Sequence, residues 1–323
     1  MTTTRLYKST DSGAPVLSGQ AGSMVNLLQK CLVDGYGALP AAGWTRPFTG
    51  TNTAAFRNSV SAGGTGMYLR VVDTAATYAT ARAYSVMTTV SAGSNVAPHA
   101  THLGNGVYWC KSLSADSTAR AWWLVADELA FYLLLQNGPD DVYVYNSVFG
   151  AGDMISEKPA DAWRYFVLGR YSFEIGGVGY GGELRGSTGF ADSSNSNEAL
   201  WIGRRINAAS GSIAVRPTIL GGADHQLGSS FAPLATPSPG GGNEYWHAAW
   251  IAENGTLRGR LRGVYVPISA LNATVIGTTR TGMPWAPSGS DVIVGRHSSH
   301  SYYTTYSSET LSGFGIETAL EWG

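Results

Sequence analysis

Three arginines recur at every second position toward the C-terminal end of the sequence: Arg258, Arg260 and Arg262. Side chains at alternate positions of a β-strand project from one face, so a strand here would present a row of three guanidinium groups. Guanidinium groups bind phosphates and carboxylates through paired hydrogen bonds. The row is therefore a candidate interface for an anionic sugar, a phosphate or an acidic neighbouring subunit.

The sequence also offers internal partners for this arginine row. Glu317 and Glu321 would share one face of a later strand. If the two strands pair, opposite charges meet across the ladder, and each cross-strand pair contributes roughly 0.2 to 1 kcal/mol. We favour the internal pairing, and the interface remains the alternative.

Aromatic residues form two clusters that could stack on sugar rings or on another protein. Trp246 and Trp250 precede the arginine row, and Tyr302, Tyr303 and Tyr306 follow it. We group them with the arginines as possible interface residues. The alternative is that they fill the core, as some of the 10 tryptophans must.

Two His-x2-His pairs, His99 with His102 and His297 with His300, could bring two imidazoles onto one metal ion. Neither pair has a cysteine or a carboxylate close by to complete a site or to orient the rings. We therefore expect surface histidines and no metal.

Paired carboxylates are the remaining candidates for catalysis, because glycoside hydrolysis needs two carboxyl groups about 5 to 10 Å apart. The local pairs are Asp127 with Glu128, Asp140 with Asp141, and Asp153 with Glu157. Adjacent residues on a strand point to opposite faces, so the first pair converges only across a turn. No nucleophile elbow, phosphate-binding loop or His-Glu-x-x-His motif occurs. We expect no enzyme activity and no cofactor.

One amphipathic helix is expected near the N-terminus. Its apolar face has helical spacing and consists of Met24, Leu27, Leu28, Cys31 and Leu32. Ser23 is placed to cap the start of this helix, and Gly35 is placed to end it.

Short strands separated by turns are expected from about Trp44 onward. The clearest are Met67–Val72, Tyr84–Val90, Gly106–Lys111, Arg120–Ala126, Ala130–Leu135, Val142–Phe149 and Trp163–Gly169. Apolar residues at both alternating sets of positions indicate strands covered on both faces, as in a sandwich. Asn254-Gly255 predicts a hairpin that Pro267 ends.

These elements predict a mainly β fold with antiparallel, sandwich-like or barrel-like sheets and one short N-terminal amphipathic helix. We divide the chain into an N-terminal arm and helix (1–43), a main β domain (44–220), a Pro/Gly-rich loop (221–243) and a C-terminal β segment (244–323) that packs on the main domain.

Composition favours contact with other protein. Only 13% of the residues are charged, and 17 arginines stand against 4 lysines. Arginine and aromatic residues are enriched at interfaces, where lysine is depleted. The alternative source of this bias is a genome rich in G and C.

Charge and hydropathy limit the partners. A net charge of −1 gives no general attraction to nucleic acid or to anionic lipid. No run of apolar residues is long enough to span a membrane, and the first ten residues lack a signal-peptide core. We expect synthesis in a cytoplasm, with Cys31 and Cys110 as buried thiols.

Several short segments spread along the chain resemble segments of one group of proteins. They are Tyr7–Asp11, Gly13–Pro15, Gly19–Ser23, Leu32–Gly37, Gly43–Phe48, Gly50–Asn52, Tyr68–Arg70, Arg120–Trp122, Ala126–Glu128, Phe131–Tyr132 and Arg258–Gly263. In these segments the chain resembles structural (virion) proteins of tailed bacteriophages and prophages. None of the segments is a catalytic signature, so the resemblance implies no functional residue.

The resemblance and the composition together predict a virion subunit of the tail tip, baseplate or fibre attachment. We expect a homo-oligomer that acts by assembly with other virion proteins, its N-terminal arm and long loops ordering on contact. The alternative is a head-decoration or host-glycan-binding protein, and a third is an envelope-degrading hydrolase.

Overall fold

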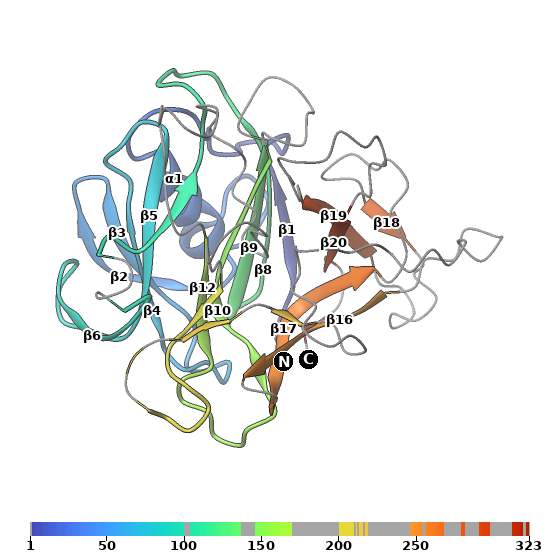
Figure 1. Ribbon diagram of the computed structural model, residues 1–323. Coiled ribbons are helices and arrows are strands. Elements are labelled where there is room, and N and C mark those ends of the chain that lie inside the picture. The colour runs from blue at the N-terminus through green and yellow to red at the C-terminus, as the bar shows by residue number, and fades with distance from the viewer. Residues whose placement is uncertain are drawn as a thin grey trace, which may run out of the picture.

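The computed structural model describes residues 2–99, 104–136, 146–169, 200–209, 211, 213–215, 217–218, 246–253, 256–267, 279–281, 291–297, 312–318 and 321–322. Within these ranges the chain forms three antiparallel sheets and one short helical segment (Figure 1). The predicted fold class is confirmed. No helix in these ranges is long and apolar enough to cross a membrane.

The main sheet lies in the middle of the molecule and has seven strands. In spatial order they are β1 (Arg5–Lys8), β8 (Ala121–Ala126), β9 (Ala130–Gln136), β10 (Asn146–Asp153), β12 (Tyr165–Leu168), β13 (Leu200–Ile202) and β14 (Ile213–Val215). Strand β1 at its edge pairs with β8, over 100 residues later in the sequence. Strand β1 therefore belongs to the main sheet, and the ordering of an N-terminal arm on assembly stays a prediction.

A six-stranded sheet covers one face of the main sheet. Its strands are β2 (Thr45–Gly50), β3 (Thr53–Arg57), β4 (Tyr68–Val72), β5 (Tyr78–Met87), β6 (Gly93–Ala97) and β7 (Val107–Cys110). They follow one another along the chain, and β7 returns to pair with the first half of β5. Local hairpins therefore build this sheet.

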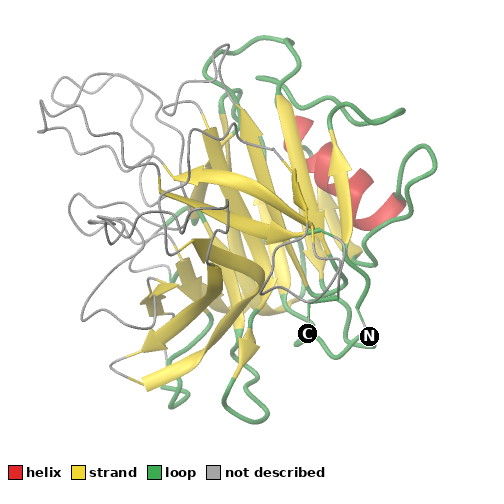
Figure 2. Ribbon diagram, turned by 90° about the vertical axis from the view of Figure 1, so that its right-hand side faces the viewer, coloured by secondary structure: helices red, strands yellow, loops and turns green. Residues whose placement is uncertain are grey.

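A C-terminal sheet covers the opposite face of the main sheet, with its strands running at a steep angle to those of the main sheet (Figure 2). Its strands are β15 (Pro217–Thr218), β16 (Trp246–Glu253), β17 (Thr256–Pro267), β20 (Ser312–Glu317), β19 (Asp291–His297) and β18 (Thr279–Thr281), with β11 (Ile155–Ser156) paired to β17. Strands β16 and β17 form the hairpin predicted around Asn254-Gly255, and β17 ends at Pro267 as expected.

Strand β9 shows why the main sheet holds both outer sheets. All residues from Ala130 to Leu135 are buried. Phe131 and Leu133 point into a core shared with the six-stranded sheet, whereas Tyr132 and Leu134 point into a core shared with the C-terminal sheet. Because side chains alternate between faces, apolar residues at both sets of positions require a cover on each side. The prediction of strands covered on both faces is confirmed.

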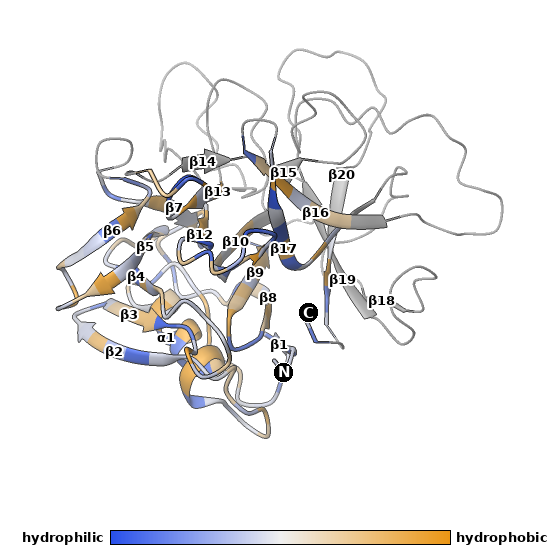
Figure 3. Ribbon diagram, turned by 90° about the horizontal axis from the view of Figure 1, so that it is seen from below, coloured by the Kyte–Doolittle hydropathy of each residue, from blue (hydrophilic) through white to orange (hydrophobic). Residues whose placement is uncertain are grey.

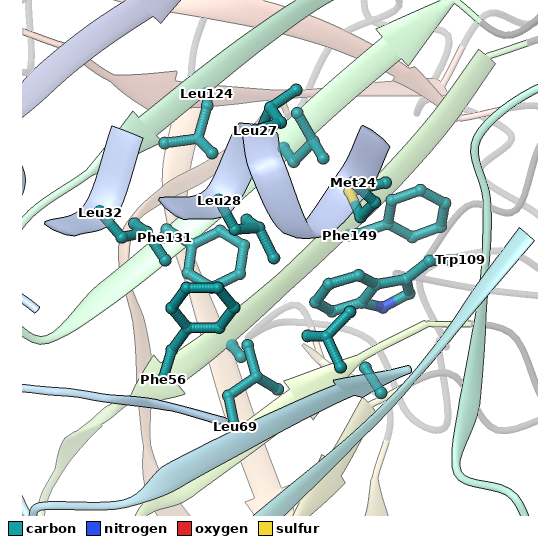
Figure 4. Packing of buried hydrophobic residues seen from close by; sticks show 14 of the residues in the cluster. Met24, Leu27, Leu28, Leu32, Phe56, Leu69, Trp109, Leu124, Phe131 and Phe149 are labelled. Carbon is teal, nitrogen blue, oxygen red and sulfur yellow. The ribbon is translucent and has the colours of Figure 1, made fainter. Parts of the chain in front are cut away.

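The helix fills the first core between the two sheets. It comprises α1 (Ser23–Leu28) and a π-helical continuation, η1 (Gln29–Asp34), followed by Gly35 at φ 77°. Figure 4 shows the helix residues packed against aromatic side chains of both sheets, among them Phe56 and Phe131. The predicted apolar face and its end are confirmed.

The start of α1 differs from the expectation. The Ser23 hydroxyl donates to the carbonyl of Ser18 and does not cap the helix. The cap is Asp73, whose Oδ2 accepts the N–H groups of Met24 at 2.8 Å and Val25 at 3.3 Å. A residue 49 positions away supplies this contact, so local spacing could not reveal it.

Two strands of the C-terminal sheet, β11 and β15, come from the segment that the sequence analysis assigned to the main β domain. Residues 221–243 lie outside the described ranges. Strand β11 pairs with Gly259 and Arg260 of β17, and the Glu157 N–H that follows β11 donates to the carbonyl of Arg258. Strand β15 pairs with β16, so residues that we assigned to the main domain belong to the C-terminal sheet.

Phe131 offers a test of the first core. Its ring packs edge-on against Trp44 and Trp109, and Phe131→Ala would leave a cavity between the two sheets. We expect the free energy of unfolding to fall by about 3–5 kcal/mol in denaturant titration. Val86→Ala, at a position that is 50% exposed, is the control and should stay within about 0.5 kcal/mol of the wild type. Equal losses in both variants would contradict this packing.

Candidate functional site

The arginine row lies on β17, but its three side chains serve different internal contacts. Arg258 is fully buried. Its guanidinium group lies 2.8 Å from Glu253 Oε2 and 3.4 Å from Asp161 Oδ2. Both carboxylates are also buried, so Arg258 is not available to a partner, and its place among possible interface residues is corrected.

Arg262 joins the C-terminal sheet to the main sheet. Its guanidinium lies 3.2 Å from Asp127 Oδ2 and also donates to the carbonyl of Trp322 and the hydroxyl of Thr2. Asp127 is fully buried, and its other oxygen accepts the backbone N–H groups of the turn between β8 and β9. Burial raises the pKa of this carboxyl, while the guanidinium and the N–H donors oppose the rise.

The partners of these arginines differ from those expected. Internal pairing is correct for Arg258 and Arg262, but their carboxylates are Glu253, Asp161 and Asp127 rather than Glu317 and Glu321. These acidic residues lie on turns and on neighbouring elements. For Arg258 and Arg262, strand alternation therefore identified the wrong acids.

The remaining predicted interface residues divide between described and undescribed parts of the chain. The half-buried Arg260 lies over the ring of Trp250, 5.9 Å from its centroid. Trp246 pairs with Pro267 in the β16–β17 ladder. Tyr302, Tyr303 and Tyr306 lie outside the described residues, so their role stays a prediction.

Asp127 and Asp153, each one member of a candidate carboxylate pair, are held by internal contacts. Asp127 is held by Arg262 and by the backbone N–H groups described above. Asp153 is buried, and its Oδ2 and Oδ1 accept the N–H and the hydroxyl of Thr65, each at 2.6 Å. Asp140, Asp141, His102 and His300 lie outside the described ranges. Within them, no group of three or more His, Cys, Asp or Glu side chains could hold a metal ion.

A small polar cavity of about 260 Å³ opens beside Arg260, between the C-terminal sheet and the end of the described chain. Tyr265, Glu317 and Glu321 line it together with the ring of Trp322. Sequence reasoning treated the two glutamates only as partners of arginines and did not anticipate a shared cavity. Because Glu317 is only 2% exposed, its carboxyl group is nearly inaccessible to a ligand that enters the cavity.

The outer face of the six-stranded sheet is a second candidate site. In β3, β4 and β5 one alternating set of residues, including Phe56 and Leu69, enters the first core. The other set therefore points away from it. That set contains Arg57, Tyr68, Arg70, Arg82 and Tyr84, which we call the arginine–tyrosine face.

Ring contacts organise this face. Arg57, Tyr68 and Tyr84 lie in one cross-strand row. The Arg57 guanidinium lies 5.0 Å from the centroid of the Tyr68 ring, and Tyr68 stacks on Phe48 with centroids 6.1 Å apart. Cation–π and stacking contacts of this kind hold the side chains in defined positions. The face is thus a built platform of rings and guanidinium groups.

Within the described ranges, the strands that carry the arginine–tyrosine face contribute charge of one sign to it. From Thr45 to Cys110 the sequence has four arginines and one acidic residue, Asp73, which is fully buried. Arg70 and Arg82 lie directly opposite each other on β4 and β5, and like charges in this register repel. Arg70 Nε is buried without a hydrogen-bond partner among the described residues.

Sequence reasoning missed this face because its arginines are far apart along the chain, and only the hairpin register brings them together. The available signal was the near absence of acidic residues between Thr45 and Cys110.

Comparison with known proteins adds no family. No protein-family model and no curated protein matches the sequence. The resemblance to virion proteins therefore stays a prediction.

Arg258 gives a test of the internal role of the arginine row. Arg258→Met would leave Glu253 and Asp161 buried without their cation, so we expect the free energy of unfolding to fall by about 3–5 kcal/mol. The control is Arg205→Met, whose side chain is exposed and which should stay within about 0.5 kcal/mol of the wild type. The measurement is urea unfolding of both variants; similar stabilities would refute the internal role of Arg258.

Proposed function

We propose that this chain is a non-enzymatic structural subunit of a tailed-phage particle, in the tail tip, baseplate or fibre attachment, and that it acts by binding neighbouring subunits. The observation that carries the proposal is the arginine–tyrosine face, whose arginines and Tyr68 are half-buried and lie on strands without an exposed acidic side chain. Arginine and aromatic residues are enriched in protein–protein interfaces. The assignment to a tailed-phage particle rests on the resemblance to virion structural proteins.

The partner proposed for this face is a carboxylate-bearing surface of a neighbouring virion subunit. Two copies that met through this same face would bring like-charged guanidinium groups together, which is unfavourable. In a homo-oligomer the face would therefore meet a different surface of the next copy. Arginine forks bind carboxylates with two parallel hydrogen bonds, which also fixes the orientation of the partner.

The internal use of Arg258 and Arg262 also shapes this proposal. Those arginines hold the C-terminal sheet to the rest of the chain. Assembly is therefore assigned to the arginine–tyrosine face on the opposite side of the main sheet. Arg260 and Trp250 remain a possible secondary contact.

Particle composition is the first test. Mass spectrometry of purified particles, from the phage or induced prophage that encodes the chain, should detect it in fixed proportion to the other structural proteins. Immunogold labelling should place it at the tail. Particles that are infectious and contain none of this chain would refute the proposal.

Neutral substitutions test the proposed binding face. In a phage lacking the native gene, Arg70→Gln combined with Arg82→Gln should lower incorporation into particles by roughly tenfold or more, because two charge-assisted contacts are lost. Urea unfolding of the same doubly substituted chain checks that the fold is intact, so that a loss of incorporation can be assigned to the face. Arg205→Gln, at an exposed position on the loop after β13, is the control and should incorporate normally.

The same variants separate subunit binding from glycan binding. Normal incorporation with lost adsorption to host cells would overturn the subunit interface and indicate an acidic host polysaccharide as the ligand of the face.

A further inference from the structure

Lys111 and Asp73 form an ion pair in the interior of the molecule. Both side chains are fully buried, and Lys111 Nζ contacts Asp73 Oδ1 directly. Asp73 follows β4 and Lys111 follows β7, and both strands pair with β5. The two residues thus meet at the same end of the six-stranded sheet, beside the start of α1.

Backbone groups fix both partners. Lys111 Nζ also donates to the carbonyl of Gln20 at 2.6 Å, which leaves the amine little freedom to turn away. Asp73 Oδ2 accepts the N–H groups of Met24 and Val25. Two N–H donors on one carboxyl oxygen resemble the arrangement that stabilises negative charge on an oxygen during acyl transfer.

The choice of lysine at this position has chemical consequences. Elsewhere in the described ranges, buried acids such as Asp127 and Glu253 are paired with arginine, which keeps its proton. A lysine can lose its proton and become a nucleophile when it is desolvated. Burial lowers the pKa of Lys111 and raises the pKa of Asp73, so both shifts favour a neutral amine facing a neutral carboxylic acid.

We propose that Lys111 Nζ and Asp73 Cγ become joined by an isopeptide bond within the folded chain. The site is a modification site of the chain itself and does not rest on the proposed function. It needs no co-reactant, because an amine and a carboxylic acid condense to an amide and water.

The atoms of the reaction can be assigned from these contacts. The lone pair of the neutral Lys111 amine attacks Asp73 Cγ, and negative charge develops on Oδ2, where the N–H groups of Met24 and Val25 lie. One amine proton moves to the hydroxyl at Oδ1, which leaves as water. The C=O bond to Oδ2 re-forms, and the nitrogen keeps one hydrogen as the amide N–H.

The cross-link would close a loop between β4 and β7 and fix the start of α1 to the sheet. A covalent tie that spans 38 positions restricts the unfolded chain, as a disulfide does. We therefore expect the linked chain to unfold at a higher temperature than a chain that cannot form the bond.

The deciding experiment is the intact mass of the purified full-length chain under denaturing conditions. We expect a mass lower by one water than that of the unlinked chain with the same N-terminus. Proteolysis should yield one branched peptide that contains both Asp73 and Lys111. A full unlinked mass after prolonged incubation of the folded chain would overturn the proposal.

Variants distinguish this bond from other losses of water. Lys111→Arg keeps a cation but cannot form the amide, so it should show the full mass, as should Asp73→Ala. Lys158→Arg changes a lysine that donates to the carbonyl of Ile206 and should still lose the water. If Lys111→Arg still loses water, the loss comes from cyclisation at an aspartate, and the cross-link is refuted. If these variants do not fold, the presence or absence of the branched peptide in the wild-type chain decides the outcome.

Discussion

Burial of the main sheet on both faces is the constraint on which the rest of the structure depends. Strand β9 places alternate side chains in two separate cores, and β8, β10, β12 and β13 do the same. A sheet of this kind is stable only with a second layer on each side. The six-stranded sheet and the C-terminal sheet supply those layers, and α1 fills the space that remains in the first core.

Charge is distributed differently across the two layers. At the C-terminal sheet, strand β17 carries strongly hydrophilic residues among apolar ones (Figure 3), and its Arg258 and Arg262 are matched to buried carboxylates. At the six-stranded sheet the arginines lie on the outer face, away from the core. Buried ion pairs favour one particular arrangement of partners, since a misplaced strand would leave a buried charge unmatched. Arginine therefore stabilises the packing of the C-terminal sheet and lies on the outer face of the six-stranded sheet.

Much of the fold could be predicted from the sequence, because alternation and turn residues act locally. The strands near Ala130 and Trp163, the hairpin at Asn254-Gly255 and the end at Pro267 all follow from such patterns. The contacts that position the candidate sites are not local. Asp73 caps α1 and Asp127 holds Arg262 across separations of 48 positions or more. The opposition of Arg70 and Arg82 depends on the register of a hairpin, which short polar and small residues specify only weakly.

The order of the strands along the chain also bears on how the protein is made. The six-stranded sheet is complete once residue 110 has emerged, and most of the main sheet once Ile202 has. The face of the main sheet that carries Tyr132, Leu134 and Phe166 then waits for strands β16 to β20, which are synthesised last. During that interval a nascent chain exposes a broad apolar surface, the kind that recruits chaperones or aggregates when translation stalls.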